Sequence, residues 1–242
     1  MTGVYIISAP SGSGKSTLVN RVREIVPGLK FSISYTTRAP RGREKNGREY
    51  CFVSRSEFEA MIGQNQFLEY ADVFGNYYGT PRRFLREAEQ EGNDLLLDID
   101  VQGAAQIKGL IPQAISIFVL PPNRQELEKR LRARGQDSEA VIQRRMDTAR
   151  RKIENYCKYD YILVNDRLDE SVESLKSILL AERLQRSGAQ KPRQHGPEKQ
   201  DPVSADEAGL IAKAQRFRLE NMGERLQPIL DSFRKGVASS GS

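Results

Sequence analysis

The stretch Val4-Tyr-Ile-Ile-Ser-Ala-Pro-Ser-Gly-Ser-Gly-Lys-Ser16 decides the fold of this chain. It joins a short apolar run to a turn rich in glycine and serine, and a helical pattern begins at Ser16. Glycines at positions 12 and 14 allow backbone N–H groups to point inward around an anion. The Lys15 ammonium can then reach the outer phosphates of a nucleotide, and the Ser16 hydroxyl can bind Mg²⁺. The stretch therefore predicts a phosphate-binding loop between a buried strand and a helix.

The loop departs from the general pattern at Ala9, which occupies the position of the first glycine. A small residue at this position still permits the turn. The alternative is an ordinary surface turn, but strand, loop and helix occur in the order that the motif requires. We therefore assign nucleotide binding to Ala9, Pro10, Ser11, Gly12, Ser13, Gly14, Lys15 and Ser16.

Short apolar runs that alternate with helical patterns predict the fold class. The runs that predict buried strands are Val4–Ala9, Phe31–Tyr35, Asp94–Ile99, Ile115–Leu120 and Tyr161–Val164. The patterns that predict helices are Ser16–Val26, Val101–Leu110, Arg124–Arg134, Ser138–Tyr156 and Asp169–Leu184. This alternation is typical of an α/β fold of three layers, with a central parallel sheet covered by helices on both faces.

Two segments break the alternation. Shorter β-like pieces at Glu49–Val53, Phe67–Val73 and Tyr77–Tyr78 flank the helical pattern Ser56–Gly63, so we interpret residues 33–83 as an inserted α+β lobe. After a main domain of residues 1–185, a polar stretch at 186–204 predicts a linker. Residues 205–242 form a C-terminal extension of unknown role. Its pattern predicts a helix over Asp206–Gly236 with a kink at Pro228.

Composition excludes several classes of protein. With 242 residues and 38% hydrophobic residues, the chain can fill a core. No apolar run approaches the roughly 18 residues of a membrane-spanning helix, and we see no secretory signal. Cys51 and Cys157 form no disulfide or zinc pattern, and the single histidine, His195, lies in a polar stretch, which argues against catalysis by imidazole. We expect a cytoplasmic protein without a membrane partner.

A net charge of +6 favours anionic partners. The arginines gather at Arg38–Arg48 and Arg124–Lys152, and this distribution fits small phosphorylated ligands at least as well as a polynucleotide. We therefore do not expect a nucleic acid partner. The sequence leaves open whether the protein is a monomer or a homo-oligomer.

A metal-binding carboxylate is expected at the end of a second strand. The run Asp94-Leu-Leu-Leu-Asp-Ile-Asp100 brings Asp98 and Asp100 to the carboxyl end of a buried strand, where α/β sheets bind ligands. We expect Asp98 to serve Mg²⁺ and Asp100 to serve the phosphoryl acceptor, although the pattern does not decide which acid does which. The alternative is that these acids cap the helix that begins near Val101.

The sequence resembles guanylate kinases over about Gly3–Leu184. Several separate blocks of sequence carry the resemblance, and they occur in the order typical of the family. They are Ser8–Ser16, Ser34-Tyr-Thr-Thr-Arg-Ala-Pro-Arg41, Gly47-Arg-Glu-Tyr50, Phe52–Ser54, Phe67–Glu69, Gly75-Asn-Tyr-Tyr-Gly-Thr80, Leu97–Gly103 and Arg132–Gly135. The resemblance implies a P-loop NTPase-type fold with an inserted GMP-binding lobe (residues 33–83) and a helical lid (residues 122–152). It also implies an enzyme of purine nucleotide metabolism that transfers phosphate from ATP, with Mg²⁺, to GMP and dGMP.

The resemblance also implies roles for individual residues. Glu69 would accept the two parallel donors of guanine, N1–H and N2–H₂, while Thr80 would donate to O6. Two arginine forks can clamp the acceptor phosphate. The full set of expected substrate-binding residues is Ser34, Arg38, Arg41, Tyr50, Glu69, Tyr78, Gly79, Thr80 and Asp100.

The remaining implied roles concern the transferred phosphoryl group. The expected catalytic residues are Lys15, Arg38, Arg134 and Arg145, because cations neutralise charge that spreads over this group. Asn165 resembles a residue beside adenine, and Ser16 and Asp98 are the expected metal ligands. Two alternatives remain, a non-catalytic guanylate-kinase-like module that binds phosphopeptides and a P-loop kinase of a phosphorylated ribose compound.

Overall fold

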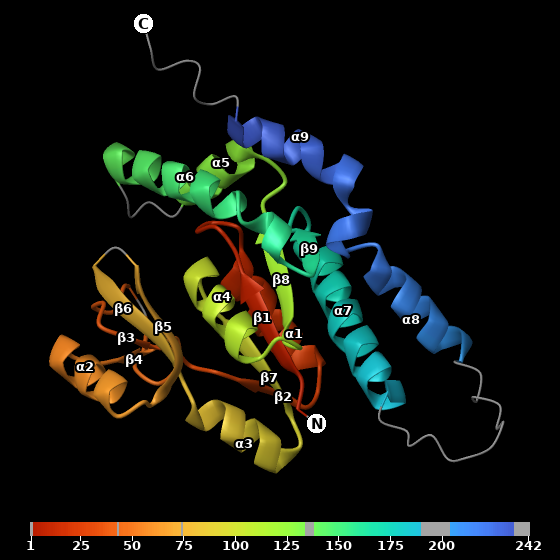
Figure 1. Cartoon of the computed structure of the whole chain (residues 1–242). Coiled ribbons are helices and arrows are strands. Elements are labelled where there is room, and N and C mark those ends of the chain that lie inside the picture. Colours follow the sequence, from red (N-terminus) through yellow and green to blue (C-terminus); the bar gives the residue numbers. More distant parts are fainter. Residues whose placement is uncertain (1, 43, 74, 134–137, 190–203, 235–242) are drawn as a thin grey trace, which may run out of the picture. The chain divides into compact units, whose positions relative to one another are not determined.

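The computed structural model describes residues 2–42, 44–73, 75–133, 138–189 and 204–234 (Figure 1). The chain divides into two compact units. The first unit is Met1–Ser8 with Arg23–Ile117, and the second is Ala9–Val22 with Phe118–Ser242. None of the described helices is both long enough and apolar enough to cross a membrane.

The first unit is built on parallel strands. They are β1 (Val4–Ser8), β2 (Leu29–Phe31) and β7 (Asp94–Asp98). Strand β7 pairs in parallel with β1 on one side and with β2 on the other, so these strands have the order β2-β7-β1. Every residue of β1 is buried, and its first four residues form a continuous apolar run rather than an alternating pattern, as expected for a sheet with both faces covered. Helices α3 (Arg83–Glu91) and α4 (Val101–Leu110) pack on these strands.

The inserted lobe, residues 33–83, forms a second sheet with its own aromatic core. Its strands have the order β4-β3-β6-β5. They are β3 (Tyr35–Thr36), β4 (Cys51–Phe52), β5 (Phe67–Val73) and β6 (Asn76–Pro81), and helix α2 (Arg55–Gly63) lies beside them. Ser54 and Glu57 form a capping box that starts α2, and the ring of Phe58 stacks on Phe67 at 4.4 Å. The lobe therefore has a local core that holds β5 and β6 in register.

The second unit carries the glycine-rich loop and most of the helices. Its elements are α1 (Lys15–Ile25), β8 (Ile115–Leu120), α5 (Arg124–Ala133), α6 (Glu139–Ile153), β9 (Tyr161–Val164), α7 (Leu168–Ala189), α8 (Ala205–Gln215) and α9 (Gly223–Arg234). Strand β8 lies at the boundary, because its first residues belong to the first unit. Single turns of 3₁₀ helix stand at Tyr156–Lys158 and Leu219–Asn221.

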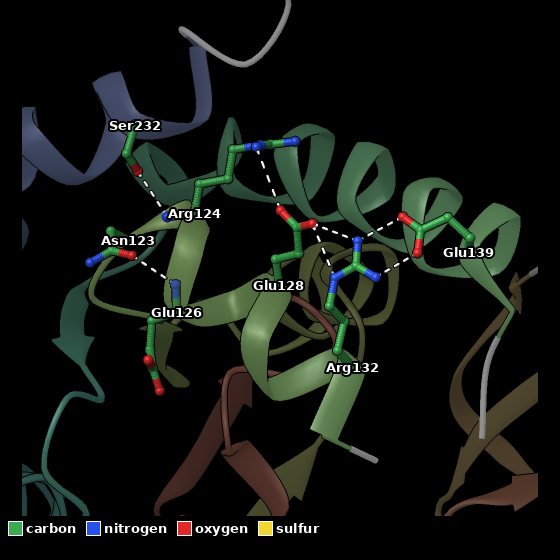
Figure 2. Close-up of polar contacts among 7 residues, drawn as sticks. All are labelled: Asn123, Arg124, Glu126, Glu128, Arg132, Glu139 and Ser232. Carbon is green, nitrogen blue, oxygen red and sulfur yellow. Dashed lines mark hydrogen bonds and ion pairs between the residues drawn. The ribbon is translucent and has the colours of Figure 1, made fainter. Parts of the chain in front are cut away.

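The C-terminal extension packs on its own unit. Helix α8 lies along α7 (Figure 1), and α9 contacts α5 and α6. Between the two helices the chain pairs with β9, because Ile162 N–H donates to the Phe217 carbonyl at 2.8 Å. Arg218 binds the nearly buried carboxylate of Glu182 at 2.7 Å and lies over the ring of Tyr161. The backbone N–H of Arg124, where α5 begins, donates to the Ser232 hydroxyl of α9 at 3.0 Å (Figure 2).

Most predicted elements are confirmed, three expectations were wrong, and one helix was missed. The predicted strand Phe31–Tyr35 is broken, because the chain leaves β2 after Phe31 and enters the other sheet at β3. Helix α3 was not predicted. The helix predicted to end at Leu184 continues to Ala189, into the stretch read as linker, and the single helix predicted over Asp206–Gly236 is two helices. The interruption lies between Gln215 and Gly223, and Pro228 lies inside α9.

Candidate functional site

The glycine-rich loop of the second unit has the backbone of an anion cradle. Gly12 and Gly14 have φ values of 96° and 83°, which side chains rarely tolerate. Ser13 N–H donates back to the Pro10 carbonyl at 3.2 Å, so the loop turns tightly before α1 begins at Lys15. The buried Ser13 hydroxyl has no hydrogen-bond partner among the described residues. Such a loop at a helix N-terminus is suited to phosphate.

Asn165 supports this loop from the end of β9. Its side chain is buried and donates from Nδ2 to the Ser13 carbonyl at 2.7 Å. A Cβ added to Gly14 would collide with the same Nδ2, so the glycine also makes room for this contact. The structure thus gives Asn165 a contact with the loop backbone, and a contact with adenine stays a prediction.

The helices after β8 bring cations to the loop. Arg145 of α6 donates from Nη2 to the Ser11 hydroxyl at 3.1 Å, so one predicted lid arginine lies at the loop. The other, Arg134, lies outside the described residues. Sequence reasoning missed Arg130, which donates to the Asn165 carbonyl at 3.0 Å and whose i,i+4 spacing from Glu126 signals an ion pair on one helix face.

An ion-pair network joins helices α5 and α6. Arg132 of α5 binds Glu128 on its own helix and Glu139 at the start of α6 (Figure 2). Its Nη2 lies 2.9 Å from a Glu128 carboxylate oxygen, and its Nη1 lies 2.5 Å from a Glu139 carboxylate oxygen. Arg132 is therefore engaged between α5 and α6, whereas Arg145 contacts the loop.

In the first unit, Glu69 and Thr80 form a buried polar pair across β5 and β6. They are opposite each other in the strand register, and Thr80 Oγ1 donates to Glu69 Oε1 at 2.6 Å. Both residues are buried, with 5% and 0% of their surface exposed. Burial raises the pKa of Glu69 to about 7, the hydrogen bonds from Thr80 act against this rise, and the charge of Asp100 adds to it. Among the described residues, no cation contributes to this shift, so the Glu69 carboxylate is buried beside a hydroxyl and not beside a positive charge.

A second cluster in the lobe gathers around Arg38. Its Nε donates to the Tyr78 hydroxyl at 3.1 Å, and its guanidinium lies over the ring of Tyr50 at 5.3 Å. Glu44, which sequence reasoning missed, pairs with the same guanidinium at 3.0 Å and accepts from the Arg41 backbone N–H at 2.8 Å. The structure therefore brings a cation and two phenols together, as expected for an anion site, and Glu44 provides the negative charge that balances the cation.

The other predicted acceptor residues have different environments. Ser34 is buried, and the side chain of Arg41 is exposed. Gly79 belongs to the aromatic core, because a Cβ there would lie 2.8 Å from Phe67 and 2.9 Å from Phe58. Gly79 thus has a packing role in addition to any contact with substrate.

The two acids at the end of β7 occupy distinct positions. Asp98 is the last residue of the strand and is half-buried, whereas Asp100 is the N-cap residue of α4. The side chain of Asp100 makes no capping hydrogen bond, so helix capping does not account for the carboxylate.

The fold and these sites define an α/β protein with a P-loop for nucleotide phosphates. A family model described as guanylate kinase matches residues 1–182. The chain belongs to the guanylate kinase family. The prediction of a P-loop NTPase-type α/β fold is thereby confirmed.

Individual relatives agree with the family model. The guanylate kinase of Koribacter versatilis is 52% identical over 234 residues, which cover 96% of this chain and 95% of that protein. The guanylate kinase of Salmonella typhi is 51% identical over 186 residues, which cover 76% of this chain and 90% of that protein. A crystal structure of guanylate kinase from Anaplasma phagocytophilum is 33% identical with a TM-score of 0.62, over 76% of this chain and 87% of that one.

The Koribacter match changes one conclusion about the C-terminal extension. We expected the resemblance to end near Leu184, but a match over 96% of the chain continues well beyond that residue. At least one curated guanylate kinase therefore shares much of the extension.

Proposed function

We propose that this protein transfers the γ-phosphoryl group of ATP to GMP, and to dGMP, and releases ADP and GDP. Family membership supports an enzyme with these nucleotide substrates. The observation that carries the proposal is the buried carboxylate of Glu69 beside the Thr80 hydroxyl. No observation favours a phosphopeptide-binding module or a kinase of a phosphorylated ribose compound.

The guanine edge explains why this pair suits GMP. Ionised Glu69 accepts N1–H and N2–H₂ together, and the Thr80 hydroxyl turns from the carboxylate toward O6. Adenine presents an N1 lone pair to the same carboxylate, so Glu69 receives no N1–H donor and Thr80 finds no O6 acceptor on the base. A site of this type can reject the wrong ligand by a factor of order 10⁴.

The cluster around Arg38 binds the acceptor phosphate in this proposal. Arg38 supplies the charge, and the hydroxyls of Tyr50 and Tyr78 supply donors beside it. The exposed Arg41 adds a second guanidinium when the loop closes on GMP. These groups hold the phosphate in line for attack, which lowers the barrier without a covalent intermediate.

The loop of the second unit holds ATP. Its backbone N–H groups and Lys15 bind the β- and γ-phosphates, and Arg145 compensates charge that develops on the transferred group. Ser16 is exposed at the start of α1, and its hydroxyl oxygen is a ligand type that Mg²⁺ accepts. The carboxylate of Asp98, the last residue of β7, stays a predicted metal ligand. Bound Mg²⁺ would neutralise phosphate charge.

We further propose that the enzyme works in the cytoplasm. Both cysteines, Cys51 and Cys157, are free thiols, which suits a reducing compartment.

A nucleotide panel tests the proposal. Full-length protein is mixed with Mg·ATP and with GMP, dGMP, IMP or AMP, and ADP release is followed in a coupled assay. We expect turnover with GMP and dGMP, a reduced kcat/KM with IMP because it lacks the N2 amino group, and about 10³-fold less or lower with AMP. Absence of GMP-dependent ADP release, or equal use of AMP, would refute the proposal.

A further inference from the structure

The backbone conformation of Gly103 in α4 does not require a glycine. The residue is buried in the first turn of a regular helix, and it is not among the glycines with positive φ. Glycine weakens a helix relative to alanine, because it loses more conformational freedom on folding. The position therefore needs another explanation.

The explanation is the carboxylate of Glu69. A Cβ added to Gly103 would lie 2.7 Å from Glu69 Cδ and 3.3 Å from Oε1, and it would collide with Oε2. Real Cβ atoms essentially never come as close as the contacts with Cδ and Oε2, so the carboxylate would have to shift. The hydrogen atoms of glycine thus form one wall of the space that holds the carboxylate, and Thr80 binds it on another side.

Helix α4 is tied to β5 beside this contact. Gln106, one turn after Gly103, donates from Nε2 to the Tyr70 carbonyl at 2.8 Å, and its Oε1 accepts from the Tyr70 N–H at 3.3 Å. Tyr70 directly follows Glu69 on the strand. Because both backbone groups of Tyr70 are bound, the helix is held against the strand, and a methyl group at Gly103 would displace the side chain of Glu69 instead.

We infer that Gly103 is a positioning residue that sets the place of the Glu69 carboxylate and thereby the preference for guanine. This inference rests on the proposed function. The displaced group is the end of a flexible side chain, so the fold can accommodate the change. Guanine recognition cannot accommodate the change, because the two parallel hydrogen bonds to the base and the contact with Thr80 depend on the position of the Glu69 carboxylate.

Gly103→Ala tests the inference, with Gly109→Ala as the matched control. Gly109 lies in the same helix, and a Cβ there meets nothing within 4 Å. We expect Gly103→Ala to raise KM for GMP about tenfold or more, to leave KM for ATP within about twofold, and to lower the GMP/AMP ratio of kcat/KM. Gly109→Ala should change none of these. If both variants have the same KM for GMP, the inference is wrong.

A double-mutant cycle with Glu69→Asp separates this steric effect from general damage. Aspartate is shorter by one methylene, so it withdraws from the added methyl group. We expect Gly103→Ala to raise KM for GMP by a smaller factor in the Glu69→Asp background than in the wild type. If Gly103→Ala raises KM for GMP by the same factor in both backgrounds, the inference is wrong. If the wild type itself fails to phosphorylate GMP, the proposed function fails instead, so the two failures are distinguishable.

Discussion

Thr80 of β6 donates its hydroxyl to Glu69 of β5 at 2.6 Å, directly across a buried strand pair. This bond satisfies one lone pair of the carboxylate, and among the described residues no arginine or lysine is one of the groups that shift its pKa. The pair is therefore arranged for an incoming ligand that donates hydrogen bonds. Guanine is such a ligand, and adenine is not.

Replacing the carboxylate should remove base selection. We expect Glu69→Ala to lower kcat/KM for GMP by at least about 10³-fold, because buried hydrogen bonds to a charged group are lost. KM for ATP should change little. Steady-state kinetics with GMP and AMP measure both effects, and an unchanged GMP/AMP ratio would show that another residue recognises the base.

The raised pKa of Glu69 predicts a pH dependence. Guanine needs the ionised carboxylate, whereas burial raises the pKa of Glu69 to about 7 in the free protein. We expect kcat/KM for GMP to fall by roughly tenfold per pH unit below pH 7. Glu69→Gln serves as the control, since the phosphate of GMP also titrates in this range. A wild-type profile parallel to that of the variant would contradict the assignment.

The same shift predicts an effect on stability. A carboxyl whose folded pKa is raised favours the fold in its protonated form, and that contribution is lost as pH rises through about 7. We therefore expect Glu69→Gln to increase the free energy of unfolding at pH 8 by about 1–3 kcal/mol, and to have little effect at pH 4. Denaturant unfolding at both pH values measures the difference. Equal stability of the two proteins at pH 8 would count against a buried, ionised Glu69.

Asn165 should affect the binding of ATP. Loss of its bond to the Ser13 carbonyl loosens the loop, so we expect Asn165→Ala to raise KM for ATP about tenfold and to leave KM for GMP nearly unchanged. Asn221→Ala is a matched control, because Asn221 makes a similar bond of 2.7 Å to the Gln215 carbonyl in the C-terminal extension. Equal KM values for ATP in the two variants would exclude a role for Asn165 in the loop.

Arg218 should anchor the C-terminal extension. Arg218→Ala leaves the Glu182 carboxylate, which is 9% exposed, without its cation, and we expect a loss of about 2–4 kcal/mol of unfolding free energy. The neighbouring Arg216 is exposed, and Arg216→Ala should stay within about 0.5 kcal/mol of wild type. Denaturant unfolding compares them. Similar unfolding free energies of the two variants would mean that the contact between Arg218 and Glu182 contributes nothing to stability.

The sequence predicted the elements whose signal is local. The helix Val101–Leu110 and the strands Ile115–Leu120 and Tyr161–Val164 match the structure residue for residue. The apolar runs of the two strands are nearly continuous and end at clear breaks. Helix α3 was missed because its buried residues are few, Phe84 and Ala88, among charged neighbours.

The sequence predictions were wrong where tertiary contacts determine the structure. Nothing local shows that the apolar run Phe31–Tyr35 leaves one sheet and enters another. The residues for base and phosphate binding could be chosen from motifs, but their supports could not. The contact of Gly103 with Glu69 joins segments distant in sequence, and the pairing of Glu44 with Arg38, six residues apart, has no sequence signal of its own. Only the folded chain reveals both contacts.

Calorimetric titration tests guanine recognition by Glu69 most directly. GMP and AMP are titrated without ATP into wild-type protein and into Glu69→Ala. We expect GMP to bind the wild type at least about 100-fold more tightly than it binds the variant, and AMP to bind both weakly. Equal affinity of GMP for the two proteins would contradict the assignment of Glu69 as the residue that selects the base.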